Sequence, residues 1–118
     1  MDNIALTEAV FYVLLSLYSP LHGYGIMQKV DGMSNGRVRL AAGTLYGAIG
    51  SMLEKGWIQA AGDGNGGAGG AGFGNGGVVG GSRKKEYVIT GLGKKVAENE
   101  LSRLMELVSN GAGIIGGD

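Results

Sequence analysis

Apolar residues along this chain follow helical spacing in four segments. In residues 5–18 they cover nearly the whole circumference, which predicts a helix that is buried on more than one side. Ser19-Pro20 ends it, because the residue before a proline avoids the α region. A second helix is predicted over residues 22–34, and Asn35-Gly36 is a typical helix stop.

The third predicted helix covers residues 43–55 and has two unlike faces. Apolar side chains recur at helical spacing on one face, namely Leu45, Ala48, Ile49, Met52 and Leu53. The opposite face carries mostly small residues, with Tyr46 at its flank, and such a bare face suits a surface pressed closely against it. A fourth helix is predicted from Thr90 to about Asn110, and its apolar stripe rotates along its length. Its first turns are therefore expected to pack on the domain, while later turns need another partner.

Strand-like patterns are shorter. Arg37 to Leu40 alternates charged and apolar residues, which predicts a short strand or an extended arm. The runs "WIQAA" and "KKEYVIT" predict a β-hairpin with a long, glycine-rich tip at residues 62–82. That tract holds most of an excess of glycine, 26 of 118 residues, and it cannot bury enough apolar surface to offset its ordering entropy. We expect a flexible loop there; the pattern does not separate a natural loop from an engineered linker or from uncertain residue identities.

Three helices followed by a hairpin predict an α+β, mostly helical fold, a winged helix-turn-helix domain with a C-terminal dimerisation helix. The expected division is a DNA-binding domain at 1–90, a dimerisation helix at 91–110 and a weakly ordered tail at 111–118. In this arrangement the third helix enters the DNA major groove and the hairpin lies beside it.

Charge is distributed unevenly although the net charge is zero. Residues 20–95 contain nine Lys or Arg against four acidic residues, while the two ends are acidic. A basic middle suits a surface that faces phosphates. Neither a membrane span nor a signal peptide is evident, and with no cysteine in the chain we expect a cytoplasmic protein.

The sequence contains no arrangement of residues that supports catalysis. His22, the single histidine, has no Cys, His or paired carboxylate at ligand or acid–base spacing, so a structural role at a helix start is expected. The glycine tract lacks the Gly-Lys-Ser/Thr of a phosphate-binding loop. We therefore predict no catalytic residue, no metal and no cofactor.

Several motifs in fixed order resemble the PadR-like transcriptional regulators. They are "LLSLYSPLHGYGIMQKV", "SNGRVRL", "GTLYGAIGSMLEKGWI" and "RKKEYVIT", and the resemblance covers about residues 5–109 apart from the glycine tract. It implies a homodimeric repressor that binds an operator and is released by a small aromatic or lipophilic effector. Because its C-terminal part has room for only one long helix, the chain resembles the short subfamily.

The resemblance and the charge pattern together predict the DNA-binding residues. Thr44 and Tyr46 match the start of the family's recognition helix, and Tyr24 matches its second helix. Arg37 and Arg39 are either phosphate anchors or a solvated face. The full set is Tyr24, Arg37, Arg39, Thr44, Tyr46, Ser51, Arg83, Lys84 and Lys85.

Two departures from the family pattern lie around the recognition helix. Ala41-Ala42 replaces the usual capping pair, a loss that costs about 1 kcal/mol. Gly50 replaces a longer polar residue, at a cost of about 1 kcal/mol more. They keep open a second function, a winged-helix interaction module with weak or lost DNA binding.

Apolar residues of the two terminal helices predict the contacts beyond DNA. The expected dimer interface comprises Val10, Leu14, Ala97, Leu101, Leu104, Met105 and Val108. An effector pocket is predicted from the residues Phe11, Tyr12, Leu15 and Trp57, which would otherwise belong to the core.

Overall fold

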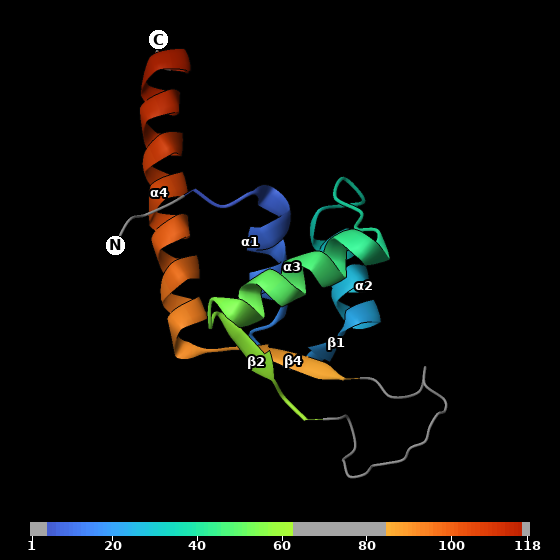
Figure 1. The fold of residues 1–118 in the computed structure, drawn as a ribbon. Helices are drawn as coiled ribbons and strands as arrows, with labels where there is room; N and C mark the ends of the chain where they lie inside the picture. The colour runs from blue at the N-terminus through green and yellow to red at the C-terminus, as the bar shows by residue number, and fades with distance from the viewer. Residues whose placement is uncertain (1–4, 63–84, 117–118) are drawn as a thin grey trace, which may run out of the picture.

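A computed structural model describes residues 5–62 and 85–116. In chain order its elements are α1 (Glu8–Ser16), β1 (Leu21–His22), α2 (Gly23–Met33), α3 (Ala42–Glu54), β2 (Ile58–Ala60), β4 (Glu86–Ile89) and α4 (Gly91–Ile115). Figure 1 shows α1, α2 and α3 gathered above a small sheet, with α4 rising beside them. This is the mostly helical winged-helix architecture that the sequence predicts.

The sheet is antiparallel and has the order β1-β4-β2. Ile58 pairs with Ile89 and Ala60 with Tyr87, so β2 and β4 form the predicted hairpin. The other edge of β4 is occupied by Leu21, which lies opposite Tyr87. The third strand therefore precedes α2, where the sequence pattern did not indicate one.

Residues 37–40 do not form a strand, so the predicted strand is wrong and an irregular arm occupies this position. The Val38 amide donates to Ser34 Oγ at 2.9 Å instead of joining a ladder. The side chains of Val38 and Leu40 pack against the core, which explains the alternating pattern without a strand partner. Asn35 and Gly36 have positive φ angles of 56° and 80°, and they end α2 as predicted.

The helix starts follow the local sequence. Thr7 caps α1 through a hydrogen bond from the Val10 amide, 3.1 Å long. His22 caps α2, its Nδ1 accepting from the Gly25 amide at 3.2 Å, so its predicted structural role is confirmed. Ala41 precedes α3 without a side-chain cap, as the sequence predicted.

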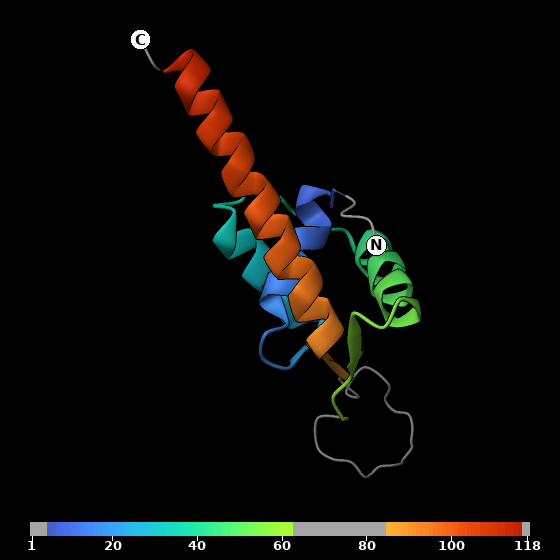
Figure 2. The ribbon, with the colours of Figure 1, turned by 90° about the vertical axis from the view of Figure 1, so that its left-hand side faces the viewer.

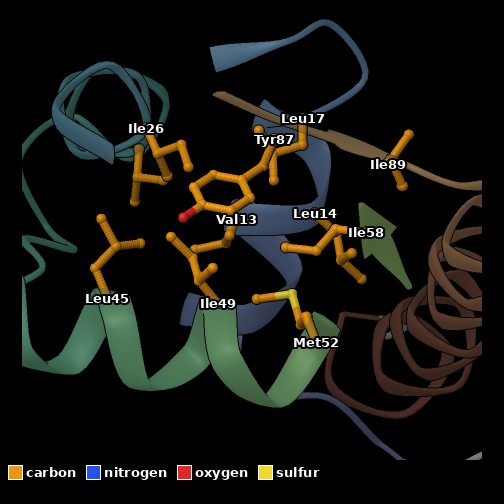
Figure 3. Packing of buried hydrophobic residues seen from close by; sticks show 11 residues of the cluster. Val13, Leu14, Leu17, Ile26, Leu45, Ile49, Met52, Ile58, Tyr87 and Ile89 are labelled. Atoms are coloured by element: carbon orange, nitrogen blue, oxygen red, sulfur yellow. The ribbon is translucent and has the colours of Figure 1, made fainter. Parts of the chain in front are cut away.

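One core joins all layers. Figure 3 shows Leu45, Ile49 and Met52 of α3 pointing toward Val13, Leu14 and Tyr87, and each of these side chains is buried. Leu53, predicted on the same apolar face, is substantially exposed in the last turn of α3. The end of α1 is tied to the hairpin because the Ile89 amide donates to the Leu17 carbonyl at 2.8 Å.

The long helix α4 is anchored at its first turns. Thr90 caps it, accepting from the Gly93 amide at 3.0 Å, and donates to the Gly56 and Trp57 carbonyls. Gly93, Ala97 and Glu100 form its buried face. Figure 2 shows the later turns extending away from the rest of the molecule.

Helix α4 is longer than predicted. It continues to Ile115 rather than ending near Asn110, so residues 111–115 are helical and not a weakly ordered tail. Isolated glycines weaken a helix without forbidding it, and the Ala and Ile residues between them keep this last turn helical. The predicted flexible wing tip at 62–82 lies outside the described residues except for Gly62.

Candidate nucleic-acid interface

The outward face of α3 is open along its length. A Cβ atom added at Gly43, Gly47 or Gly50 would meet no atom within 4 Å. Thr44 and Ser51 are exposed on this helix, and the Ser51 hydroxyl accepts from Lys55 Nζ at 3.1 Å. The buried face of the same helix holds it on the core, so α3 presents a rigid backbone with few side chains in the way.

Two tyrosines flank the start of this surface. Tyr24, in the first turn of α2, is 61% exposed, and Tyr46 of α3 is 51% exposed. The Tyr46 ring leans on Gly23 at the start of α2. The N-terminal turn of α3 has free backbone N–H groups, since Ala41 offers no cap, and such groups attract phosphates. Thr44 and Tyr46 thus lie near the part of α3 that favours an anion.

The arginines of the arm carry acidic partners. Arg37 forms an ion pair with Glu8, 2.5 Å between Nη1 and Oε2, and Arg39 lies 3.8 Å from Asp31. The hydrogen bond to Glu8 raises the pKa of Arg37 above its ordinary value. Both pairs are largely exposed, so their attraction is modest and a phosphate can compete for either guanidinium.

The hairpin supplies the remaining predicted contacts. Lys85 is exposed and directly precedes β4, the middle strand of the sheet. Arg83 and Lys84 lie outside the described residues.

Residues of the predicted dimer interface divide into two groups. Leu14 and Ala97 are buried in the chain's own core, so neither is free to contact a partner and their predicted place in the dimer interface is wrong. They were assigned from an apolar pattern that core and interface share. Val10 and Leu104 are half-buried, whereas Leu101, Met105 and Val108 stand exposed on α4.

The proposed effector residues are all half-buried. Tyr12 and Trp57 pack against the hydrophobic core, and Lys55 Nζ lies 5.2 Å from the centre of the Trp57 ring. These contacts give both aromatics a role in the fold, and a pocket among Phe11, Tyr12, Leu15 and Trp57 stays a prediction.

Sequence reasoning missed Glu100. Its side chain is only 3% exposed, and it is held by Arg103, 3.0 Å between Nε and Oε1. It also accepts from the Leu6 amide at 3.4 Å. The hydrogen bond from Arg103 lowers the pKa of Glu100 below 4.5. Its position could have been noticed in the sequence, because Glu100 follows Gly93 and Ala97 at helical spacing and therefore falls on the buried side of α4.

Within the described residues, no group of three or more His, Cys, Asp or Glu side chains is placed to hold a metal ion. None of the helices in residues 5–62 and 85–116 combines the length and apolarity that crossing a bilayer requires.

Three helices, a hairpin beside an open α3 and a projecting terminal helix define a winged helix-turn-helix protein of the DNA-binding class. Residues 10–69 match the transcriptional regulator PadR-like family. The chain therefore belongs to the PadR-like family of transcriptional regulators, and DNA binding is the activity of that family.

A solved structure agrees with this fold. A transcriptional regulator from Clostridium thermocellum superimposes with a TM-score of 0.63 over 91% of this chain and 88% of its own length, at 16% identity. At that identity the likeness concerns the fold alone. A comparison with curated proteins gave no match.

Proposed function

We propose that this protein is a cytoplasmic, homodimeric repressor that binds operator DNA and releases it when a small aromatic or lipophilic effector binds. The observation that carries the DNA-binding part is the open outward face of α3, with Thr44 and Tyr46 at its uncapped start. An α-helix with one face free along its length is the shape that the major groove admits.

Phosphate contacts in this proposal surround α3. Tyr24 and Tyr46 donate their hydroxyl hydrogens at one end, and Lys85 directly precedes strand β4 of the hairpin. Arg37 and Arg39 exchange their acidic partners for phosphates. Because three glycines of α3 carry no side chain, Thr44 and Ser51 are the short polar readers on this face, and sequence preference comes mainly from DNA shape and spacing.

The homodimer is supported by the apolar surface of α4. Met105 is 61% and Val108 is 69% exposed, and Leu101 lies on the same helix. Side chains of this size gain about 1.5–3 kcal/mol each when fully buried, which a second copy of α4 can supply. In the proposed domain division, 1–90 for DNA and 91–110 for dimerisation, these three side chains belong to the dimerisation helix.

The test is a titration of duplex DNA fragments from the chromosomal region upstream of the gene, followed by fluorescence anisotropy at several salt concentrations. Repressor activity predicts saturable binding that weakens steeply with salt. Met105→Asp with Val108→Asp should give a folded monomer with weaker operator binding, and Glu106→Gln on the same helix is the control. A dimer that survives the double substitution in sedimentation analysis contradicts the interface.

Effector release has a direct optical test because Trp57 is the only tryptophan. Hydrophobic aromatic compounds that bind near Phe11, Tyr12 and Leu15 should change the fluorescence of Trp57 and lower DNA affinity together. Compounds that change the fluorescence without changing DNA affinity would separate the pocket from regulation.

A second function is favoured by one specific observation. Gly47 and Gly50 leave α3 without long polar side chains between Tyr46 and Glu54, and both arm arginines are paired with acids. These features suit a winged-helix module that binds a protein. Absence of salt-sensitive binding to any duplex DNA would favour this module over the repressor.

A further inference from the structure

The start of α2 and the recognition helix meet at a single glycine. Gly23 is the first residue of α2 and is buried. A methyl group placed there would lie 2.7 Å from Cζ and 3.3 Å from Cε1 of Tyr46, and closer still to its hydroxyl. Non-bonded carbon atoms prefer about 3.5–4.0 Å, so the Tyr46 phenol occupies the space that any other residue would fill.

Helix α3 itself gives the Tyr46 ring little support. Side chains three and four positions apart on a helix are its neighbours, and here two of these positions are Gly43 and Gly50, which have open space around them. Of the other two, Ala42 is small and Ile49 points into the core. The orientation of this half-exposed ring is therefore set from α2.

Strand β4 of the hairpin lies beside the contact between Gly23 and Tyr46. Tyr87 of β4 lies opposite Leu21 of β1, two residues before Gly23. Burial, and secondarily the Tyr46 hydroxyl, raises the pKa of Tyr87, which agrees with the two phenols lying close together. Tyr46 thus stands where α2, α3 and the hairpin converge.

We infer that Gly23 is a positioning residue for DNA binding, because its missing side chain lets the Tyr46 phenol rest on the start of α2 and fixes where the hydroxyl meets the phosphate backbone. The inference rests on the proposed function, in which Tyr46 contacts DNA. Gly23 itself touches no DNA; it acts through Tyr46.

Gly23→Ala is the test variant, and Gly32→Ala is its control on the same helix, since Gly32 has nothing within 4 Å of its added methyl. The atoms displaced in Gly23→Ala are the far end of an exposed side chain, so the fold should persist. Losing one hydrogen bond to a charged phosphate lowers DNA affinity by about ten- to a hundredfold. The slope of log affinity against log salt should not change, because no charge is lost.

A double-substitution cycle shows whether Gly23 acts through Tyr46. Tyr46→Ala should weaken binding by about the same factor as Gly23→Ala, and adding Gly23→Ala to Tyr46→Ala should have no further effect. In free protein, an NMR cross-peak between the Gly23 α protons and the Tyr46 ring should be present in the wild type and in Gly32→Ala. In Gly23→Ala the cross-peak between the α proton of residue 23 and that ring should weaken, because the methyl group displaces the phenol.

Each adverse result has a distinct meaning. Wild-type protein without salt-sensitive DNA binding overturns the proposed function and this inference together. Binding that is reduced by Tyr46→Ala but unchanged by Gly23→Ala overturns the inference alone. An equal loss from Gly23→Ala in the Tyr46→Ala background, a missing cross-peak in the wild type, or an unfolded Gly23→Ala protein assigns Gly23 to the fold and also overturns it.

Discussion

Replacing Gly93 with alanine should loosen the attachment of α4 to the hairpin. A methyl group at Gly93 would press on the Trp57 carbonyl and lie 2.7 Å from Cγ1 of Ile89. The Trp57 carbonyl cannot move away cheaply, because it accepts hydrogen bonds from the Thr90 amide at 2.9 Å and the Thr90 hydroxyl at 3.0 Å. The first turn of α4 must therefore shift away from the strands.

The expected magnitude is a balance of two effects. Overpacking a tight site costs about 1–3 kcal/mol, and replacing glycine by alanine within a helix returns up to about 1 kcal/mol. Gly93→Ala should therefore lower the free energy of unfolding by about 1–2 kcal/mol. The midpoint of thermal unfolding should fall by about 5–15 °C, given about 4–8 °C per kcal/mol for a domain of this size.

The control is Gly91→Ala, two residues earlier in the same turn, where an added methyl meets no atom within 4 Å. It should match or exceed wild-type stability. Thermal and urea unfolding should be followed by circular dichroism at one fixed protein concentration, since the stability of a dimer depends on concentration. If Gly93→Ala is as stable as the wild type, or if Gly91→Ala loses as much, the packing argument is wrong.

Three further outcomes can be measured. Because the pKa of Glu100 is lowered in the folded protein, its ionised form stabilises the fold above pH 4.5, and this stabilisation disappears as the pH falls through the lowered pKa. In urea unfolding between pH 3 and 7, Glu100→Gln should lose this pH-dependent part of the stability, while the exposed control Glu98→Gln keeps it. Replacing Arg83, Lys84 and Lys85 by alanine should flatten the log–log salt dependence by about 0.9 for each lost phosphate contact, without changing the preferred sequence, and an unchanged slope would remove the wing from the interface. Glu8→Gln should release Arg37 and raise DNA affinity at low salt; equal affinity would return Arg37 to a solvated role.

The sequence predicted the helices well because their signals are local. Leu45, Ile49 and Met52 recur at helical spacing and are the residues that α3 buries. Asn35-Gly36 ended α2 through backbone angles that few other residues adopt. The hairpin followed from two strand-like runs, and the order of all these elements was enough to predict the winged helix.

Long-range partners could not be predicted in the same way. Leu21 and His22 form a strand only because β4 offers an edge, and two residues carry no periodic pattern. Leu14 was assigned to an interface because apolarity does not distinguish a core from a partner. At the site, the sequence suggested Tyr46 but gave no sign that Gly23, over twenty residues earlier, receives its ring.

The hydrogen bonds between the Trp57 carbonyl and Thr90 have a consequence for the architecture of an operator. They hold the turn after α3 against the start of α4, so the two helices keep a fixed orientation relative to each other. With 25 residues, α4 is about 37 Å long, and each residue turns it by about 100°. In the proposed dimer, the separation of the two recognition helices is then set by which turn of α4 meets its partner. A single inserted residue after Leu104 keeps the Glu100–Arg103 pair and would leave each DNA-reading half intact, yet it would aim the two halves at different faces of the double helix.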